Sequence, residues 1–472
     1  SMVAISLLIT ESEYISHGRI KEGVFWGNST SSMQTEGAWN EGGKGMSVYD
    51  IKPSGPDNSY WKVAIDEYHR YPEDVNIMQN LGMNFYRFQI SWSRVQPEGE
   101  GDFNQTGIDF YNRLIDNLLK AGIEPMICLY HFDMPLALAK KYNGFLNQKV
   151  VSAFFEYAKK MIEKFGDRVK YWITFNEQNC FSLSSAFESS GYLTGKKTLR
   201  ELYQIQHNTI LAHCLVANYI HQSKPDLKIG GMEAFQEAYP YSPLPTDVEV
   251  TRKYKEFVDY NLLRVFVEGK YSTEVIGFMK ENHLEDILKP SDLLEIGNNR
   301  SDFISFSYYT TSTLDSSQIP VGSIPNYYGQ MGYKKNPYLL SNEWGWQIDP
   351  QGFYGILIDL YNRTHLPIFP IENGIGVREN WDGQNQIDDS YRVQYHRSHI
   401  RALKKAVRDG ANVIGYLGWG LIDIPSSKGN VDKRYGVVYV NRTNHEILDL
   451  KRVPKKSYYW LQKVIKSNGT EL

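Results

Sequence analysis

The stretch "KYWITFNE" (residues 170–177) decides the fold, because it joins the pattern of a buried strand to a terminal carboxylate. Its aromatic and β-branched residues run continuously instead of alternating with polar ones, which is typical of a strand covered on both faces of a parallel sheet. The closing Glu177 is of a type that is seldom buried without a partner or a task. The stretch therefore predicts a parallel strand with a functional group at its carboxyl end.

Seven further segments of this kind alternate with helical patterns along the chain. The candidate strands occupy residues 23–30, 84–92, 124–132, 227–233, 302–310, 367–374 and 413–422. Apolar residues at three- and four-residue steps predict helices over 153–166 and 391–410, each ending on glycine. Eight βα units in unbroken order predict an α/β fold, a (β/α)8 TIM barrel. A doubly wound sheet would need a glycine-rich phosphate turn after the first strand, and "GNSTSSMQTEG" (27–37) is not one.

We expect residues 1–472 to form a single catalytic domain with long βα loops around the active site. The stretches 37–65 and 311–345 are interpreted as such loops, and residues 1–20 as an N-terminal extension. Ser1 precedes Met2 and is interpreted as an added residue.

Composition narrows the class of protein. The 472 residues are 42% hydrophobic and 22% charged with a net charge of −3, and basic residues are scattered, so nucleic acid is not an expected partner. No apolar run reaches the roughly 18 residues of a membrane span. The three cysteines, Cys128, Cys180 and Cys214, lack the spacing of metal ligands, and their odd number argues against a disulfide framework. The segment "SMVAISLLIT" (1–10) lacks the features of a signal peptide. These features favour a cytoplasmic protein.

Two carboxylates end predicted strands. Asn176 and Glu177 close the fourth strand and Glu372 closes the seventh, within "PIENG" (370–374). Barrel enzymes carry their chemistry at these strand ends, and two facing carboxylates suit glycoside hydrolysis, in which one protonates the leaving oxygen and the other attacks the anomeric carbon. The alternative is that each glutamate only pairs with a nearby arginine.

Motifs along nearly the whole chain resemble those of the retaining β-glucosidases of glycoside hydrolase family 1. The combination of "TFNE" (174–177) with "IENG" (371–374) is the most specific. The others are "FWGNSTSSMQTEGAW" (25–39), "YRFQISWSRVQP" (86–97), "YHFDMP" (130–135), "DFISFSYYT" (302–310), "GWGLID" (418–423) and "KKSYYWLQKVI" (455–465). The sequence departs from the family at two of these positions. Ser307 stands where the family usually has Asn, and Gln89 stands where it usually has Ser.

The resemblance implies a role for each matching residue. Glu177 would be the general acid/base and Glu372 the nucleophile, about 5 Å apart as retention requires. Arg87 would lower the pKa of Glu372, and the charge of Glu372 would raise that of Glu177. The other implied contacts are Arg87 and Tyr309 with the nucleophile, Asn176 with the sugar 2-hydroxyl, Gln34 and His131 with ring hydroxyls, Trp419 under the sugar, and Trp346 at the aglycone. Structural packing is the alternative for His131 and Trp419. Neither a metal nor an organic cofactor is implied.

The stretch "LIDIPSSKGNVDKRYG" (421–436) separates this chain from plain β-glucosidases. Those enzymes carry Glu seven residues after the strand-eight Trp, where it binds the sugar O4 and O6, and here the position is Ser426. A carboxylate about 4 Å from a phosphate would repel it by several kcal/mol, whereas Ser426, Lys433 and Tyr435 are donors. They resemble the phosphate site of the 6-phospho-glycosidases of the family, although a solvated loop is the alternative.

Ser427 bears on the sugar epimer. The galactose-specific phospho-enzymes of the family carry Trp directly after the phosphate Ser, and the glucose-specific ones a smaller residue. The resemblance thus predicts a cytoplasmic bacterial 6-phospho-β-glucosidase, with a 6-phospho-β-galactosidase or a non-catalytic sugar-phosphate-binding protein as alternatives. The expected partner is the small-molecule substrate, and a homo-oligomer stays open.

Overall fold

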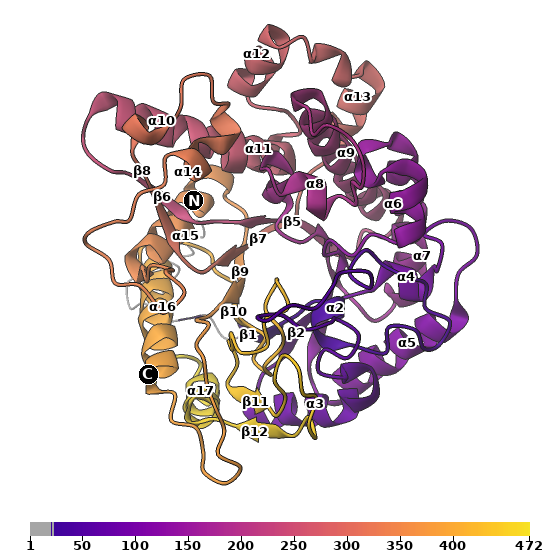
Figure 1. Ribbon diagram of the computed structural model, residues 1–472, viewed down its shortest axis with the longest axis vertical. Coiled ribbons are helices and arrows are strands. Elements are labelled where there is room, and N and C mark those ends of the chain that lie inside the picture. Colours follow the sequence, from indigo (N-terminus) through magenta and orange to yellow (C-terminus); the bar gives the residue numbers. More distant parts are fainter. Residues whose placement is uncertain (1–19, 21–22) are drawn as a thin grey trace, which may run out of the picture.

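The computed structural model describes Ile20 and residues 23–472, and a ring of eight parallel strands forms its centre (Figure 1). These strands are β1 (Phe25–Ser29), β2 (Phe85–Gln89), β3 (Glu124–Tyr130), β4 (Tyr171–Phe175), β5 (Lys228–Ala234), β7 (Phe303–Tyr308), β9 (Ile368–Asn373) and β10 (Gly415–Trp419). They lie in the order β10-β1-β2-β3-β4-β5-β7-β9. Two backbone hydrogen bonds close the ring between β9 and the segment that leads into β10. The Ile368 N–H donates to the Asn412 carbonyl (2.8 Å), and the Ile414 N–H donates to the Ile368 carbonyl (3.0 Å). All eight predicted strands and the (β/α)8 barrel are confirmed.

Helices surround this ring (Figure 1). They are α2 (Ser32–Thr35), α3 (Glu67–Leu81), α4 (Trp92–Val95), α5 (Gln105–Lys120), α6 (Leu136–Tyr142), α7 (Gln148–Phe165), α8 (Ala186–Ser189), α9 (Leu199–Ser223), α10 (Pro245–Lys255), α11 (Asn261–Glu268), α12 (Thr273–Glu281), α13 (Pro290–Asn298), α14 (Tyr328–Met331), α15 (Pro350–Thr364), α16 (Ser390–Arg408) and α17 (Lys456–Lys466). Single turns are η1 (Gly144–Leu146), η2 (Gln178–Ser182), η4 (Glu285–Ile287), η5 (Ser316–Gln318) and η6 (Pro325–Tyr327), with a π-helical turn η3 (Glu256–Tyr260). The helices predicted over 153–166 and 391–410 correspond to α7 and α16.

Local sequence explains where the long helices begin. The Asn147 side chain accepts the Lys149 N–H before α7, and Thr198 and Glu201 form a reciprocal capping box at the start of α9. The buried residues of α7 follow helical spacing, so one face of the helix packs on the barrel.

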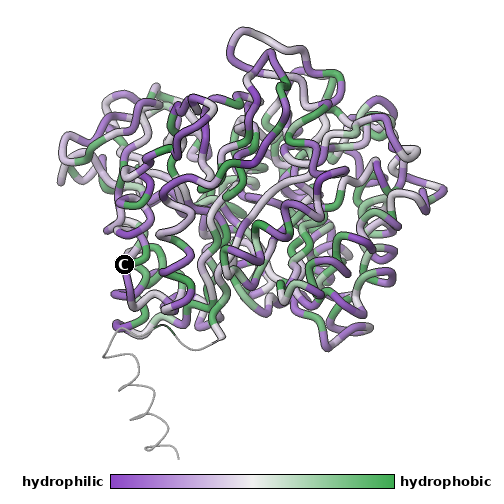
Figure 2. Tube along the Cα trace, turned by 90° about the horizontal axis from the view of Figure 1, so that it is seen from below, coloured by the Kyte–Doolittle hydropathy of each residue, from purple (hydrophilic) through white to green (hydrophobic). Residues whose placement is uncertain are grey.

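The amino-terminal half of the barrel is filled by apolar side chains. The Phe85 ring lies 4.5 Å from that of Phe25 and 5.1 Å from that of Phe369. Met126, Ile173 and other buried residues complete this cluster. Figure 2 shows hydrophobic segments gathered inside the molecule and hydrophilic ones along its rims. The packed interior leaves the carboxyl ends of the strands as the open face.

The two predicted long loops differ in content. Residues 37–65 contain neither helix nor ladder-forming strand, as expected. Residues 311–345 contain α14 and begin with β8 (Thr311–Leu314), which pairs with β6 (Glu237–Pro240) in a small parallel sheet. This sheet was not predicted, because each strand has only four residues and its partner lies far away in the sequence.

Two expectations concern the rest of the chain. The N-terminal extension lies outside the described residues except for Ile20. The interpretation of Ser1 as an added residue therefore also concerns a residue outside the described part. Within the described part, none of the helices is long and apolar enough to cross a membrane, and the three cysteines are unpaired.

Candidate active site

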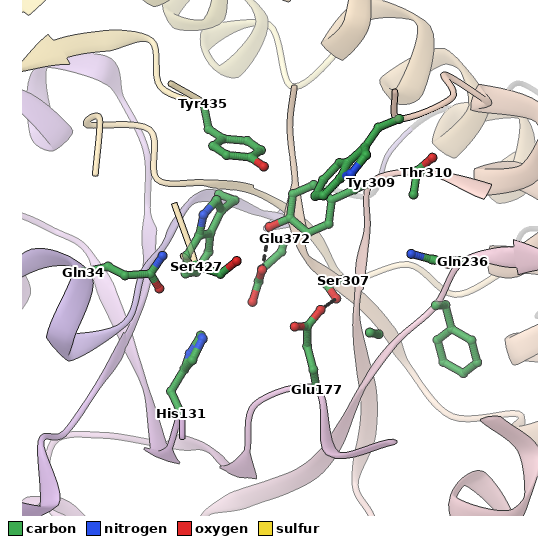
Figure 3. A pocket seen from close by; sticks show the side chains of 14 residues that line it. Gln34, His131, Glu177, Gln236, Ser307, Tyr309, Thr310, Glu372, Ser427 and Tyr435 are labelled. Atoms are coloured by element: carbon green, nitrogen blue, oxygen red, sulfur yellow. Dashed lines mark hydrogen bonds between the residues drawn. The ribbon is translucent and has the colours of Figure 1, made fainter. Parts of the chain in front are cut away.

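A cavity lies at the carboxyl ends of the barrel strands and contains both predicted catalytic carboxyl groups (Figure 3). Glu177 follows β4 and Glu372 lies near the end of β9. The residues lining the cavity are Gln34, His131, Glu177, Ala234, Phe235, Gln236, Ser307, Tyr309, Thr310, Trp346, Glu372, Trp419, Ser427 and Tyr435. The predicted glutamates therefore face one common space, and their separation of about 5 Å stays a prediction.

The backbone places Glu177 by an unusual conformation. Its φ is +39°, in the left-handed region that non-glycine residues rarely occupy outside turns and functional sites. This turn joins β4 to η2. The Ser307 hydroxyl donates to Oε2 of Glu177 at 2.5 Å, and the Asn176 amide lies 3.5 Å from Oε1. Neutral donors thus hold the Glu177 carboxyl.

A cation and a phenol hold the other carboxyl group. Arg87 donates from Nη1 to Oε2 of Glu372 at 2.8 Å, and the Tyr309 hydroxyl donates to Oε1 at 2.6 Å. Arg87 is fully buried and also donates from Nη2 to Oδ1 of Asn176 at 2.6 Å. The predicted contacts of Arg87 and Tyr309 with Glu372 are therefore present. The Arg87 guanidinium also orients Asn176 next to Glu177.

Burial dominates the protonation of both carboxyl groups. It raises the pKa of Glu372 to about 7, reinforced by the nearby Glu177 and opposed by Arg87 and Tyr309. Burial also raises the pKa of Glu177, opposed by the Ser307 hydroxyl, Arg87 and Asn176. Arg87 does lower the pKa of Glu372, as expected, but desolvation outweighs Arg87 and the net pKa is raised. For Glu177 the main cause is burial rather than the charge of Glu372.

The predicted sugar-binding residues line one end of the cavity. The Gln34 amide is fixed at both atoms, accepting from the Ser31 hydroxyl at 2.5 Å and donating to the Pro425 carbonyl at 2.9 Å. His131 lies against Trp419, with ring centres 5.9 Å apart. Burial lowers the pKa of His131 well below its usual range, and its Nδ1 has no partner among the described residues. A neutral imidazole that lines the cavity can bond a sugar hydroxyl.

The predicted phosphate-binding residues occupy a second hollow that adjoins the cavity. Ser426 and Lys433 line this hollow, while Tyr435 lines the cavity itself, and Trp346 and Ser427 line both. The structure thus brings all five to the border of the two spaces.

Lys433 carries a charge that the protein does not neutralise. Its Nζ lies 3.8 Å from the centre of the Trp346 ring, and no carboxylate pairs with it in the described part of the chain. Burial and the nearby Lys428 lower its pKa to about 8. Beside it, the Ser426 hydroxyl accepts the Asn430 N–H at 3.2 Å, which leaves its proton for a ligand. Lys433 and Ser426 can together bind an anion.

Comparisons with known proteins agree with this geometry. The pattern of glycosyl hydrolase family 1 matches residues 16–470. The chain belongs to glycosyl hydrolase family 1. It is 38% identical over 470 residues to a 6-phospho-beta-glucosidase of Clostridium longisporum, covering 95% of this chain and 97% of that one. It is 36% identical over 467 residues to the aryl-phospho-beta-D-glucosidase BglC of Bacillus subtilis, again covering 95% and 97%.

A solved structure of the family has the same fold. The family 1 b-glucosidase from Thermotoga maritima superposes with a TM-score of 0.86 at 32% identity, covering 96% of this chain and 99% of that chain.

Sequence reasoning missed part of this family 1 site. Ser307 was noted only as a departure from the family, although it donates directly to Glu177. Ala234, Phe235, Gln236 and Thr310 line the cavity and were not predicted. Ser307 and Thr310 lie at a predicted strand end, so their position was a usable signal. Residues 234–236 follow a predicted strand, and nothing in their types points to a ligand.

Proposed function

We propose that this protein hydrolyses 6-phospho-β-D-glucosides, releasing glucose 6-phosphate with retention of the anomeric configuration. The observation that carries this proposal is the unpaired ammonium of Lys433, next to Ser426 and at the border of the cavity that contains Glu177 and Glu372. A phosphate on O6 can pair with that ammonium while the anomeric carbon faces the carboxyl groups. The printed names of several relatives, including a phospho-cellobiase of Klebsiella oxytoca, support the same substrate class.

In the first step, the Glu372 carboxylate attacks the anomeric carbon while Glu177 gives its proton to the glycosidic oxygen. The bond to the leaving group breaks as the bond to Glu372 forms, and an alcohol departs. In the second step, Glu177 takes a proton from water, whose oxygen displaces Glu372 and yields the β-anomer. Asn176 bonds the 2-hydroxyl, Gln34 and His131 bond ring hydroxyls, and the sugar rests on Trp419.

The assignment of roles follows from the partners of each carboxyl group. The nearby Glu177 is one cause of the raised pKa of Glu372, because two negative charges in one pocket repel each other. The single negative charge is best placed on Glu372, since its two oxygens accept from a guanidinium and a phenol. Glu177 accepts from neutral donors and keeps the proton, as a general acid requires.

Ser427 favours the glucoside over the galactoside. Its short side chain lines both the cavity and the phosphate hollow, so it leaves room for an equatorial O4 and lacks the indole N–H that a Trp would offer to an axial one. Such an enzyme suits the bacterial cytoplasm, where a phosphotransferase system supplies imported disaccharides in phosphorylated form.

One panel of substrates tests the proposal. We expect p-nitrophenyl 6-phospho-β-glucoside to exceed the unphosphorylated glucoside in kcat/KM by at least about 100-fold, and the 6-phospho-galactoside by at least about tenfold, or about 1.4 kcal/mol. A preference for the galactoside would refute the interpretation of Ser427 alone. A preference for the unphosphorylated glucoside would refute the phosphate site. Absence of turnover on all three substrates, with sugar phosphate still bound, would instead indicate a binding protein.

A further inference from the structure

The cavity has a second end, opposite the sugar-binding residues. Figure 3 shows Gln34 on one side and Gln236 on the other, with Glu177 and Glu372 between them. Ala234, Phe235, Gln236 and Thr310 lie at or just after the ends of β5 and β7 and line the cavity, and Figure 3 places Gln236 and Thr310 on the same side. If the sugar lies near Gln34 and Trp419, the group that leaves must lie near Gln236.

Most of the polar groups at this end are already satisfied by the protein. The Thr310 hydroxyl donates to the Gln347 carbonyl and accepts the Gln347 N–H, both at 2.9 Å. The Asn179 side chain bonds both the N–H and the carbonyl of Ala234 at 2.8 Å. Phe235 is buried against Phe306, with ring centres 5.9 Å apart. These groups offer the leaving group an apolar surface with few free donors.

Gln236 is different because its amide is exposed and has a protein partner at its oxygen. The Ser312 hydroxyl donates to its Oε1 at 2.7 Å, and within the described residues its Nε2 donates to no protein acceptor. Ser312 lies on β8, opposite Ala238 of β6, and Gln236 directly precedes β6. In Figure 3 the amide nitrogen lies at the cavity end of the Gln236 side chain. Both N–H groups are therefore presented to whatever leaves the sugar.

We propose that Gln236, oriented by Ser312, donates a hydrogen bond to a hydroxyl of a carbohydrate leaving group. The preferred substrates are then phosphorylated disaccharides, whose second sugar supplies acceptor oxygens, rather than simple aryl glucosides, whose ring supplies none. The inference rests on the proposed function, since it takes the reaction as given and names the leaving group.

The test compares Gln236→Leu with the unaltered protein on two substrates, 6-phospho-cellobiose and phenyl 6-phospho-β-glucoside. Phenyl is chosen because a nitro group would itself accept a hydrogen bond. We expect kcat/KM for the disaccharide to fall about three- to tenfold, as one neutral hydrogen bond is lost, while that for the phenyl glucoside stays within about twofold. Gln330→Leu is the matched control, because Gln330 also accepts from a serine, Ser184 at 3.1 Å, but lines neither hollow.

Equal losses on both substrates, or no change on the disaccharide, would overturn the role of Gln236. Failure of the proposed function looks different, because the unaltered protein would then prefer unphosphorylated substrates. In that case the same ratio, measured on cellobiose and phenyl β-glucoside, still decides whether Gln236 recognises a sugar.

Discussion

The predicted catalytic carboxyl groups and the predicted phosphate-binding residues are neighbours. They differ in how many of their polar atoms are bonded within the protein. Both oxygens of Glu372 accept hydrogen bonds from Arg87 and Tyr309 before any ligand arrives. The Lys433 ammonium pairs with no carboxylate in the described part of the chain and lies 3.8 Å from the centre of the Trp346 ring. The predicted reacting groups are thus oriented by the protein, as transition-state stabilisation requires, whereas the groups proposed to bind the phosphate are left available.

The backbone under the two regions differs in the same sense. Glu372 lies in a barrel strand paired with β7, and Glu177 follows the end of another. Residues 426–435 lie outside the barrel strands, and buried polar contacts hold this segment in place. Buried Arg434 donates to the Val440 and Arg442 carbonyls. Buried Lys455 pairs with Asp423 at 3.1 Å. Buried ion pairs and hydrogen bonds therefore anchor the loop that carries the proposed phosphate-binding residues.

The largest effect is expected at the nucleophile. Glu372→Ala removes the group that attacks the anomeric carbon, so turnover of p-nitrophenyl 6-phospho-β-glucoside should fall by about 10⁴-fold or more. Glu177→Ala should cost less on this substrate, because nitrophenolate leaves with little need of a proton. Steady-state kinetics measures both losses, and NMR of the unaltered enzyme should show the β-anomer first. A first-formed α-anomer would contradict retention.

A smaller and more selective effect is expected at Lys433. Lys433→Ala removes a charge-assisted bond to the phosphate, so KM for the 6-phosphorylated substrate should rise about 10- to 100-fold. Activity on the unphosphorylated glucoside should hardly change. Lys62→Ala is the matched control, since the Lys62 ammonium also lies over a tryptophan, 4.3 Å from the Trp39 ring centre, and lines neither hollow. Equal losses on both substrates would mean that Lys433 is structural.

The same lysine predicts a dependence on pH. Its pKa is lowered to about 8, so the charge is present below pH 8 and is lost above it. We expect kcat/KM for the phosphorylated substrate, divided by that for the unphosphorylated one, to fall about tenfold between pH 7 and pH 9. The ratio cancels the titration of the carboxyl groups. Lys433→Arg should flatten it, because arginine stays charged, and an unchanged slope in that variant would assign the titration to another group.

The sequence was sufficient for the barrel and for most of the site for a physical reason. Continuous apolar strands that end in Glu177 and Glu372 need no partner to be recognised, since burial and position appear within each segment. The phosphate site was predicted from the family resemblance, because Ser426 stands where plain β-glucosidases carry Glu, and that site stays a prediction.

What failed depends on groups far apart in the chain. Burial outweighs Arg87 in the net pKa of Glu372, and no local pattern gives the depth of a carboxyl group. The β6–β8 sheet and the Gln236–Ser312 hydrogen bond join segments about 76 residues apart. Ser307 is opposite Glu372 because the register of β7 with β9 shifts between Phe306 and Ser307. No local sequence pattern predicts this irregularity.

The smallest expected effect concerns Ser307, which orients the general acid. Its hydroxyl stabilises the ionised form of Glu177, so Ser307→Ala should raise the pKa of Glu177 further and move the alkaline limb of kcat/KM to higher pH. The rate on a disaccharide should fall only about three- to tenfold, the value of one hydrogen bond. Ser307→Asn should restore a donor and return the limb. The matched control is Ser305→Ala on the same strand, whose hydroxyl donates to the Gly231 carbonyl at 2.9 Å. If Ser305→Ala moves the limb as far, or Ser307→Ala leaves it in place, then Ser307 only packs the barrel, and Glu177 is oriented by its left-handed backbone alone.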